Sequence, residues 1–174
     1  KHRMDQLEVV PIRGNLDTRI RKVSEGLLEG VIVAAAGVKR MGWENRISQF
    51  LPTEMMVPAA CQGILGIETR QGDPLRDELA FLHDGDAWVE LSGERAFLIR
   101  LGGGCQLPVA VFGQKSGKEI RISALVGSLD GKTVIRQDIS GPAAEASILG
   151  DKLARDILDQ GGREILEALY ASAK

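Results

Sequence analysis

The stretch Arg100-Leu-Gly-Gly-Gly-Cys-Gln-Leu-Pro108 places Cys105, one of two cysteines in the chain, directly after three glycines. Glycine provides no side-chain cover and allows backbone conformations in which a ligand approaches closely. Reactive thiols lie in such partly open positions, often near cations such as Arg100 or Arg95. The stretch therefore predicts a functional thiol at Cys105, whereas Cys61 is expected to be a buried structural one.

The rest of the chain limits the chemistry that Cys105 could perform. A cysteine nucleophile of the hydrolase kind needs a histidine base, and the chain offers only His2, near its start, and His83, in a predicted loop. Two cysteines and two distant histidines match no metal-ligand spacing, so no metal site is expected. A thiol that holds a group by a permanent covalent bond fits these residues better than a thiol for acyl transfer.

Three arginines form a second candidate group, because of where the predicted elements would place them. Arg13 ends a predicted strand, Arg19 lies one turn into the next helix, and Arg40 follows a second predicted strand. Ligands bind outside the carboxyl ends of parallel strands, and the helix N-terminus near Gly14 adds backbone N–H donors. Guanidinium groups there would bind the carboxylates or phosphates of a small polyanion; the alternative for each arginine is a solvated surface charge.

The first half of the chain has the pattern of a βαβ unit followed by a crossing between domains. Residues 7–12 and 31–36 are apolar runs typical of strands, and 15–26 between them has the cap and stop signals of a helix. A strand–helix–strand order predicts parallel pairing. Proline and glycine then interrupt 51–70, where 63–67 is a further strand candidate, and 73–82 is predicted to be helical.

From about residue 84 the pattern changes to a predicted αβββα domain: an antiparallel three-stranded sheet with helices on one face. A helix is expected over 86–101, with a break near Ser92-Gly93, and Asp130-Gly131 is a hairpin turn signal. The other predicted elements are strands over 107–112, 119–126 and 133–139 and helices over 143–160, where Ile148, Leu149, Leu153, Ile157 and Leu158 form the inner side, and 163–173.

The composition excludes several classes of protein. With 44% hydrophobic and 26% charged residues, the 174-residue chain is that of a globular protein. A net charge of −2 argues against a nucleic-acid or membrane-surface partner, and two cysteines favour a reducing, cytoplasmic setting. The chain opens with Lys-His-Arg and its first predicted strand has no local partner, so we expect it to be the downstream part of a longer polypeptide.

Four motifs, in this order along the chain, resemble the porphobilinogen deaminase (hydroxymethylbilane synthase) family. They are Arg13-Gly-Asn-Leu-Asp-Thr-Arg19, Ala35-Ala-Gly-Val-Lys-Arg40, Leu51-Pro-Thr-Glu with Pro58-Ala-Ala-Cys-Gln-Gly63, and Glu94-Arg-Ala-Phe with Leu101-Gly-Gly-Gly-Cys-Gln-Leu-Pro108.

The resemblance implies three domains, of which the first two are α/β and similar to periplasmic binding proteins. The third is a small antiparallel sheet that carries the cysteine loop. This chain would then hold the second half of domain 2 (1–57), a hinge and return segment of domain 1 (58–83) and the whole C-terminal domain (84–174). The missing N-terminal part would be its partner, and the full-length protein is expected to be a monomer.

The resemblance also implies a transferase of tetrapyrrole (porphyrin and heme) biosynthesis. Cys105 would carry a dipyrromethane cofactor through a thioether, and four porphobilinogen molecules would be added to it with loss of ammonia, giving hydroxymethylbilane. By motif, Arg13, Arg19 and Arg40 would bind the carboxylates of the growing pyrrole chain and Gly14 would offer its N–H. Gln62 and Gly63 would line the cleft near the cofactor.

The chain departs from the family pattern in two respects. The family's catalytic aspartate belongs to the upstream part, and Asp17, Asp73 and Asp86 do not lie in the matching motif, so no catalytic residue and no activity are expected of this chain alone. Cys61 occupies a position that is not usually cysteine. Two other hypotheses remain: a non-catalytic anion-binding module with a thiol-bearing domain, and a redox switch that uses Cys105.

Overall fold

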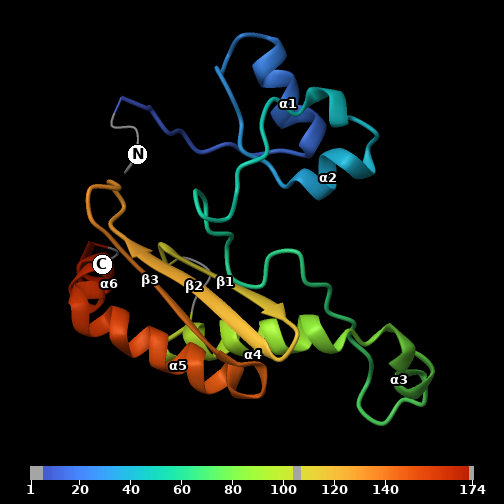
Figure 1. Ribbon diagram of the computed structural model, residues 1–174. Coiled ribbons are helices and arrows are strands. Elements are labelled where there is room, and N and C mark those ends of the chain that lie inside the picture. Colours follow the sequence, from blue (N-terminus) through green and yellow to red (C-terminus); the bar gives the residue numbers. More distant parts are fainter. Residues whose placement is uncertain (1–5, 104–106, 173–174) are drawn as a thin grey trace. The chain divides into compact units, whose positions relative to one another are not determined.

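The computed structural model describes residues 6–103 and 107–172 of the chain (Figure 1). The chain divides into two compact units, with the boundary between Met56 and Val57. Each unit has its own secondary structure, helical in the first and mixed in the second.

The first unit contains the helices α1 (Leu16–Ser24), α2 (Ala35–Arg40) and the 3₁₀ turn η1 (Glu44–Arg46). The predicted helix after Asn15 is confirmed: Asp17 lies in its first turn, where an acid stabilises the positive end of the helix dipole. The two α-helices touch, since a Cβ on Gly37 would lie 3.4 Å from Leu16 Cδ2. Val38, on α2, is buried.

The predicted βαβ unit is wrong for the residues that the structure describes. Residues 7–12 and 31–34 form no strand, and α2 begins at Ala35, inside the second expected strand. A strand exists only through hydrogen bonds to a neighbouring strand, and these two apolar runs do not pair with each other. Val9 and Ile32 therefore remain 61% and 65% exposed.

The second unit contains the predicted antiparallel sheet of three strands, in the order β1-β2-β3, with β2 in the centre. Ala124 on β2 faces Val111 on β1, and Ile122 faces Ile139 on β3. The predicted turn at Asp130-Gly131 is confirmed, and Gly131 adopts φ +72°, which glycine accepts without strain. The strands are β1 (Val109–Ser116), β2 (Glu119–Gly127) and β3 (Val134–Pro142).

Seven helical segments lie among the described residues of this unit. The longest, α4, begins after Asp84, whose carboxylate caps it by accepting the N–H groups of Asp86 (2.9 Å) and Ala87 (3.0 Å). The short segment 63–67 forms no strand. The helical elements are α3 (Leu75–Glu78), η2 (Ala80–Leu82), α4 (Gly85–Arg100), η3 (Ala143–Glu145), α5 (Ala146–Ile157), η4 (Leu158–Gly162) and α6 (Arg163–Ser172).

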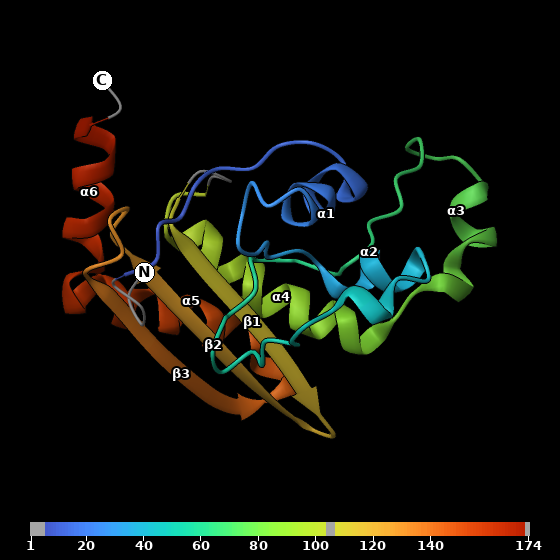
Figure 2. The same ribbon diagram turned by 90° about the horizontal axis from the view of Figure 1, so that it is seen from above.

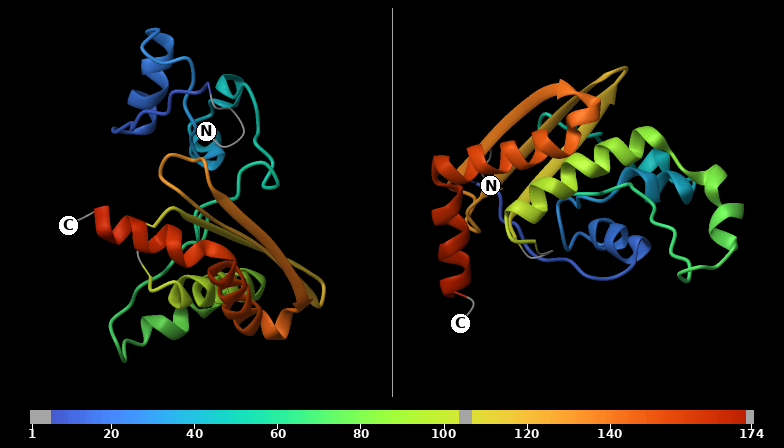
Figure 3. Two further views of the ribbon diagram at one scale, coloured as in Figure 1. Left: turned by 90° about the vertical axis from the view of Figure 1, so that its left-hand side faces the viewer. Right: turned by 90° about the horizontal axis from the view of Figure 1, so that it is seen from below.

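The core lies between the sheet and the pair α4–α5, which cover one face of it (Figures 1 and 3). Alternate residues of β2 point into this core, as the two-residue period of a strand requires. The helices contribute Phe97, Leu153 and Ile157, all at most 1% exposed. The buried residues of β2 are Ile120, Ile122, Ala124 and Val126.

The crossing of α4 and α5 depends on two glycines. A Cβ on Gly150 would lie 2.0 Å from the carbonyl oxygen of Gly93, and a Cβ on Gly93 would lie 2.6 Å from Ile122 Cδ1. The expected break of α4 near Ser92-Gly93 is therefore wrong: Gly93 allows close packing and the helix continues. Ile148, expected on the inner side of α5, is exposed.

A kink at Gly161 separates α5 from α6. Gly161 adopts φ +106°, outside the helical region, so that α6 leaves in a new direction (Figure 2). The predicted end of the helix over 143–160 at Gly161-Gly162 is thereby confirmed, and α6 follows as the expected shorter helix.

Candidate functional site

Arg19 and Gly14 lie together at the start of α1. Gly14 adopts φ +115°, and a Cβ there would lie 3.0 Å from Thr18 Cγ2, so only glycine fits. The Nε–H of Arg19 donates to the Gly14 carbonyl oxygen at 2.8 Å. The arginine thus fixes the turn that precedes the helix, and one edge of its guanidinium is already used.

Arg13 and Arg40 are exposed at two other places in the first unit. Arg13 precedes the Gly14 turn, and Arg40 is the last residue of α2. Within residues 6–103 and 107–172, neither arginine pairs with a carboxylate. The expected reason for their meeting, the carboxyl ends of two parallel strands, is absent from the described residues, so convergence of the three arginines rests on the motif alone.

Cys105 lies outside the described residues, which resume after it at Leu107. The nearby cation Arg100 is already engaged, because its Nε–H donates to Asp151 Oδ1 at 2.5 Å and Arg155 binds the other oxygen at 2.8 Å. The charge of Arg95, the second expected cation, lowers the pKa of the Cys61 thiol, against the larger effects of burial and Glu94 that raise it. Because Cys105 lies outside the described residues, its activation by either arginine stays a prediction.

Gln62 and Gly63 belong to one short turn that follows Pro58. Gln62 Oε1 accepts the Ala59 N–H at 3.2 Å, and the Ile64 N–H donates to the Cys61 carbonyl oxygen at 3.2 Å. Gly63 adopts φ +92°. Both predicted site residues are exposed.

The carboxylate of Glu94 fastens this turn to the C-terminal sheet. Glu94 is 3% exposed, in the middle of α4. Its Oε2 accepts the Cys61 N–H at 2.6 Å and its Oε1 accepts the Gly113 N–H of β1 at 2.8 Å. One buried side chain thus connects the turn, a helix and a strand.

Burial decides the electrostatics of this cluster. Desolvation raises the pKa of Glu94; its two backbone hydrogen bonds oppose that effect and the nearby charge of Glu90 adds to it. Burial, with the charge of Glu94, also raises the pKa of the Cys61 thiol, partly offset by Arg95. Cys61 is half-buried rather than fully buried, and its raised pKa is the opposite of what a reactive thiol needs.

The sequence motifs assign Glu94 no role of its own. The signal was nevertheless present, because Glu94 lies three residues after Leu91 and three before Phe97, on the apolar side of the predicted helix. An acid in that position must be buried with partners, since an unpaired buried carboxylate is costly.

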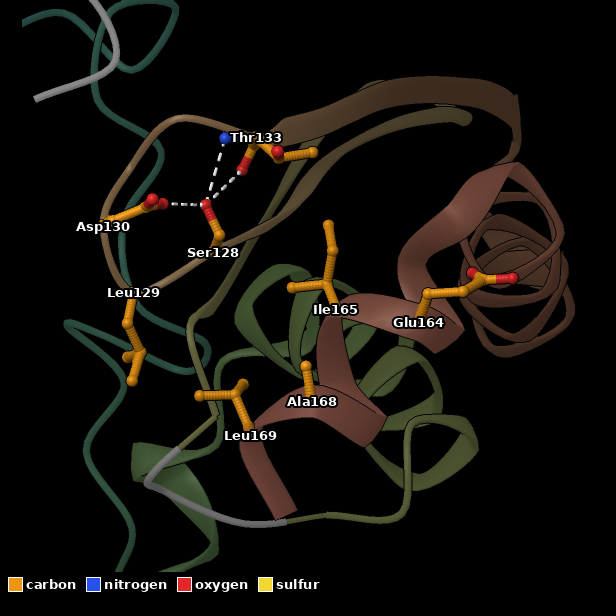
Figure 4. A pocket seen from close by; sticks show the side chains of 8 residues that line it. All are labelled: Ser128, Leu129, Asp130, Thr133, Glu164, Ile165, Ala168 and Leu169. Atoms are coloured by element: carbon orange, nitrogen blue, oxygen red, sulfur yellow. Dashed lines mark hydrogen bonds between the residues drawn. The ribbon is translucent and has the colours of Figure 1, made fainter. Parts of the chain in front are cut away.

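A pocket lies elsewhere in the second unit, between the turn at 128–133 and α6 (Figure 4). It has a volume of about 490 Å³, and on its rim the Ser128 hydroxyl contacts Asp130 (2.6 Å) and Thr133. No predicted site residue lines it. Its lining consists of Ser128, Leu129, Asp130, Thr133, Glu164, Ile165, Ala168 and Leu169.

The described part of the chain holds no cluster of three or more His, Cys, Asp or Glu side chains arranged for a metal ion. A search of the same residues finds no helix with the length and apolar character needed to cross a bilayer.

Two family models match the chain, and curated relatives match almost all of it. Residues 1–78 match "Porphobilinogen deaminase, dipyromethane cofactor binding domain" and residues 88–159 match "Porphobilinogen deaminase, C-terminal domain". The porphobilinogen deaminase of Syntrophus aciditrophicus is 55% identical over 164 residues, which is 94% of this chain and 54% of that protein. Those of Pelobacter propionicus and Trichlorobacter lovleyi are each 45% identical, over 97% and 94% of this chain and 55% and 53% of theirs.

The chain thus spans about half the length of the curated relatives it matches. The two family models cover most of the chain in the same order as the motifs, and the identities are far above those of chance similarity. On this evidence the chain belongs to the porphobilinogen deaminase family.

Proposed function

We propose that the chain is the carboxyl-terminal half of a hydroxymethylbilane synthase, a transferase that joins four porphobilinogen molecules with loss of ammonia in tetrapyrrole biosynthesis. The observation that carries the proposal is the match of two porphobilinogen deaminase models, one of them described by its cofactor, to successive parts of the chain. Since the chain covers only about half of its relatives, turnover requires the other half as well.

The described residues fit a ligand with several carboxylates, as a dipyrromethane has. Arg13 and Arg40 are exposed, and neither has a carboxylate partner among the described residues. Arg19 orders the turn at Gly14, the residue that follows Arg13. Guanidinium groups bind carboxylates through paired hydrogen bonds. A dipyrromethane supplies the free pyrrole end to which further units are joined.

In this proposal each residue has a defined task. Cys105 holds the cofactor through a thioether, so that the product remains attached while it grows. Arg13, Arg19 and Arg40, with the Gly14 N–H, bind acetate and propionate groups, and Gln62 and Gly63 line the cleft beside the cofactor. The domain limits 1–57, 58–83 and 84–174, the likeness of the first two domains to periplasmic binding proteins, a monomeric full-length protein and a cytoplasmic location belong to the same proposal.

The alternative, a non-catalytic anion-binding module with a redox-active thiol, is not supported by the comparisons. The family matches extend over both the arginine-bearing and the cysteine-bearing parts of the chain, and they name an enzyme in each case.

The test uses a fusion in which the upstream part of the Syntrophus aciditrophicus relative, which this chain does not cover, precedes Lys1. We expect the fusion to consume porphobilinogen and to carry a covalent pyrrole adduct, measured by intact mass. Cys105→Ser should lose both properties, and Cys61→Ser should keep both. A fusion that is folded but has neither activity nor adduct, or a Cys105→Ser variant with normal turnover, would contradict the proposal.

The arginines are tested in the same fusion with a matched pair on α1. Arg19→Leu should stall cofactor assembly or elongation, because it removes both a carboxylate ligand and the bond to Gly14. Arg21→Leu should not, since Arg21 pairs with Glu25 on the surface of the helix at 3.5 Å. Equal elongation by the two variants would mean that Arg19 is an ordinary surface charge.

A further inference from the structure

The turn before Gln62 has a backbone conformation that its sequence does not favour. Cys61 adopts φ +61°, the left-handed region, and is the one non-glycine residue with positive φ among those described. A side chain with a Cβ is disfavoured there relative to glycine. Some other interaction must therefore hold the turn, because local preference alone would open it.

Glu94 supplies that interaction, through the Cys61 N–H. This bond is short, at 2.6 Å, and its acceptor is a carboxylate in a buried position. Bonds to charged acceptors are the stronger class. Ala60, next to Cys61, packs against the hydrophobic core and adds a second attachment.

Glu94 is itself held in place from the opposite side. Its other oxygen accepts the Gly113 N–H, and Glu90, one turn earlier, accepts the Lys115 N–H at 2.8 Å. A Cβ on Gly113 would lie 3.2 Å from the backbone of Glu90, so α4 and β1 are in close contact. The carboxylate of Glu94 therefore has a fixed position from which to hold the turn.

We propose that Glu94 is a positioning residue: it holds Cys61 in the left-handed conformation and thereby orients Gln62 and Gly63 toward the bound pyrrole chain. The proposal rests on the proposed function, because it takes Gln62 and Gly63 to line the cofactor cleft. It gives Glu94 an effect on ligand binding in addition to its effect on stability.

The first experiment examines the hydrogen bond from the Cys61 N–H to Glu94, called the clamp below, in the 174-residue chain with no ligand present. In Glu94→Gln the side chain has one oxygen left for two N–H donors, so the Cys61 amide should exchange its hydrogen about tenfold faster or more, as loss of a buried bond to a charged acceptor predicts. Glu90→Gln is the matched control, since a carboxamide oxygen can still accept the single Lys115 N–H. Equal exchange at Cys61 in both variants would overturn the clamp.

The second experiment separates positioning from stability in the active fusion. Cys61→Val leaves the carboxylate untouched but places a β-branched residue at positive φ, and Cys61→Ser leaves the turn as it is. We expect Cys61→Val and Glu94→Gln to raise KM for porphobilinogen about tenfold, with kcat changed less, and Cys61→Ser and Glu90→Gln to leave KM unchanged. In the double variant Glu94→Gln/Cys61→Gly, glycine accepts φ +61° freely, so KM should return most of the way to the value of the unsubstituted fusion. The stability lost in Glu94→Gln should not return.

The outcomes distinguish this proposal from the proposed function. If the unsubstituted fusion is active but Cys61→Val and Glu94→Gln keep its KM, the positioning role is wrong and the function stands. If Glu94→Gln does not fold, Cys61→Val alone decides. If the unsubstituted fusion is inactive, the proposed function fails, and the amide exchange of the chain still decides whether the clamp exists.

Discussion

The two units of the chain show the same kinds of sequence pattern with opposite structural results. In the second unit the apolar face of the sheet packs against the apolar faces of the helices. Alternate residues of β2 pack on α4 and α5, and Phe97 and Ile157 are completely buried. In the first unit the strand-like runs at 7–12 and 31–34 have no partner strand among the described residues, and Val9 and Ile32 stay largely exposed. A strand-like apolar pattern therefore leads to a strand only where the fold also supplies a neighbouring strand to pair with it.

The polar interactions differ in the same way. The second unit contains a buried carboxylate with two backbone donors and a capped helix start at Asp84. The first unit relies on the exposed pair Arg21–Glu25 and on the bond from Arg19 to Gly14. Because buried bonds cost more to lose than exposed ones, substitutions should affect the second unit far more strongly.

The largest expected effect comes from filling the crossing of α4 and α5. Gly150→Ala places a Cβ where the Gly93 carbonyl oxygen lies, only 2.0 Å away, so the helices must separate. We expect the free energy of unfolding to fall by about 3 kcal/mol, at the upper end of the usual overpacking range. Urea unfolding of the chain, followed by circular dichroism, measures it.

Gly66→Ala is the matched control, since nothing lies within 4 Å of a Cβ at that position and its backbone needs no positive φ. It should change the free energy of unfolding by less than about 0.5 kcal/mol. A Gly150→Ala protein as stable as the Gly66→Ala protein would mean that the two helices do not cross at these glycines.

This crossing also shows what the sequence could and could not predict about the fold. Alternation and turn residues were sufficient for the three strands and their order, because antiparallel neighbours are joined by short turns such as Asp130-Gly131. The role of Gly93 was not predictable, because its reason is a contact with a residue 57 positions later in the chain, Gly150, and a helix alone gives no sign of it. Composition and local pattern likewise could not tell that residues 7–12 would pair with no strand among the residues that the structure describes.

The second expected effect concerns the pH dependence of the buried carboxylate. The pKa of Glu94 is raised above its ordinary value of 4.5, chiefly by burial. Its contribution to stability is therefore fully present below 4.5 and is lost as pH rises through the folded-state pKa. Glu94→Gln should remove this dependence, so the difference in unfolding free energy between wild type and variant should shrink as pH increases from about 4 to 8.

Glu90 provides the control for that titration. It is the nearby charge that adds to the raised pKa of Glu94, while Lys115, on the facing strand, is paired with Asp86 at 2.6 Å. Glu90→Gln should move the transition to lower pH without abolishing it. A pH profile that is the same in wild type and Glu94→Gln would contradict the assignment to Glu94.

A smaller effect is expected in the core of the first unit. Val38 is 2% exposed, and its carbonyl oxygen accepts the Trp43 N–H at 3.1 Å, so Trp43 fluorescence reports on it. Val38→Ala should cost about 1 kcal/mol, because a small unit can close around the missing carbons. The chain has one other tryptophan, Trp88, which lies in the second unit and serves as the control probe. A loss seen equally at both tryptophans would show that the two units unfold as one.

The candidate site was predictable to a smaller extent than the fold. Motif resemblance was enough to select Arg13, Gly14 and Arg19, and the structure brings the last two into contact. Resemblance could not select Glu94 by function, because its importance comes from two backbone N–H groups that are 33 and 19 positions away in sequence. Interactions of that range become visible only once the chain is folded.

The smallest expected effect is at the surface of the second unit, where Arg100, Asp151 and Arg155 form an ion-pair network. The hydrogen bond from Arg100, before any other interaction, lowers the pKa of Asp151, so the stabilisation is present above its ordinary pKa and is lost as pH falls through the folded-state value. Asp151→Asn should lower the urea midpoint slightly at pH 7 and not at all in about 1 M salt, where the screening length is only about 3 Å. Asp156→Asn, which removes the looser 3.4 Å pair with Lys152, should have less effect still. If the lower urea midpoint of Asp151→Asn persisted in about 1 M salt, the network would behave as a buried one. The proposed difference between the buried hydrogen bonds of Glu94 and the surface ion pairs would then be wrong.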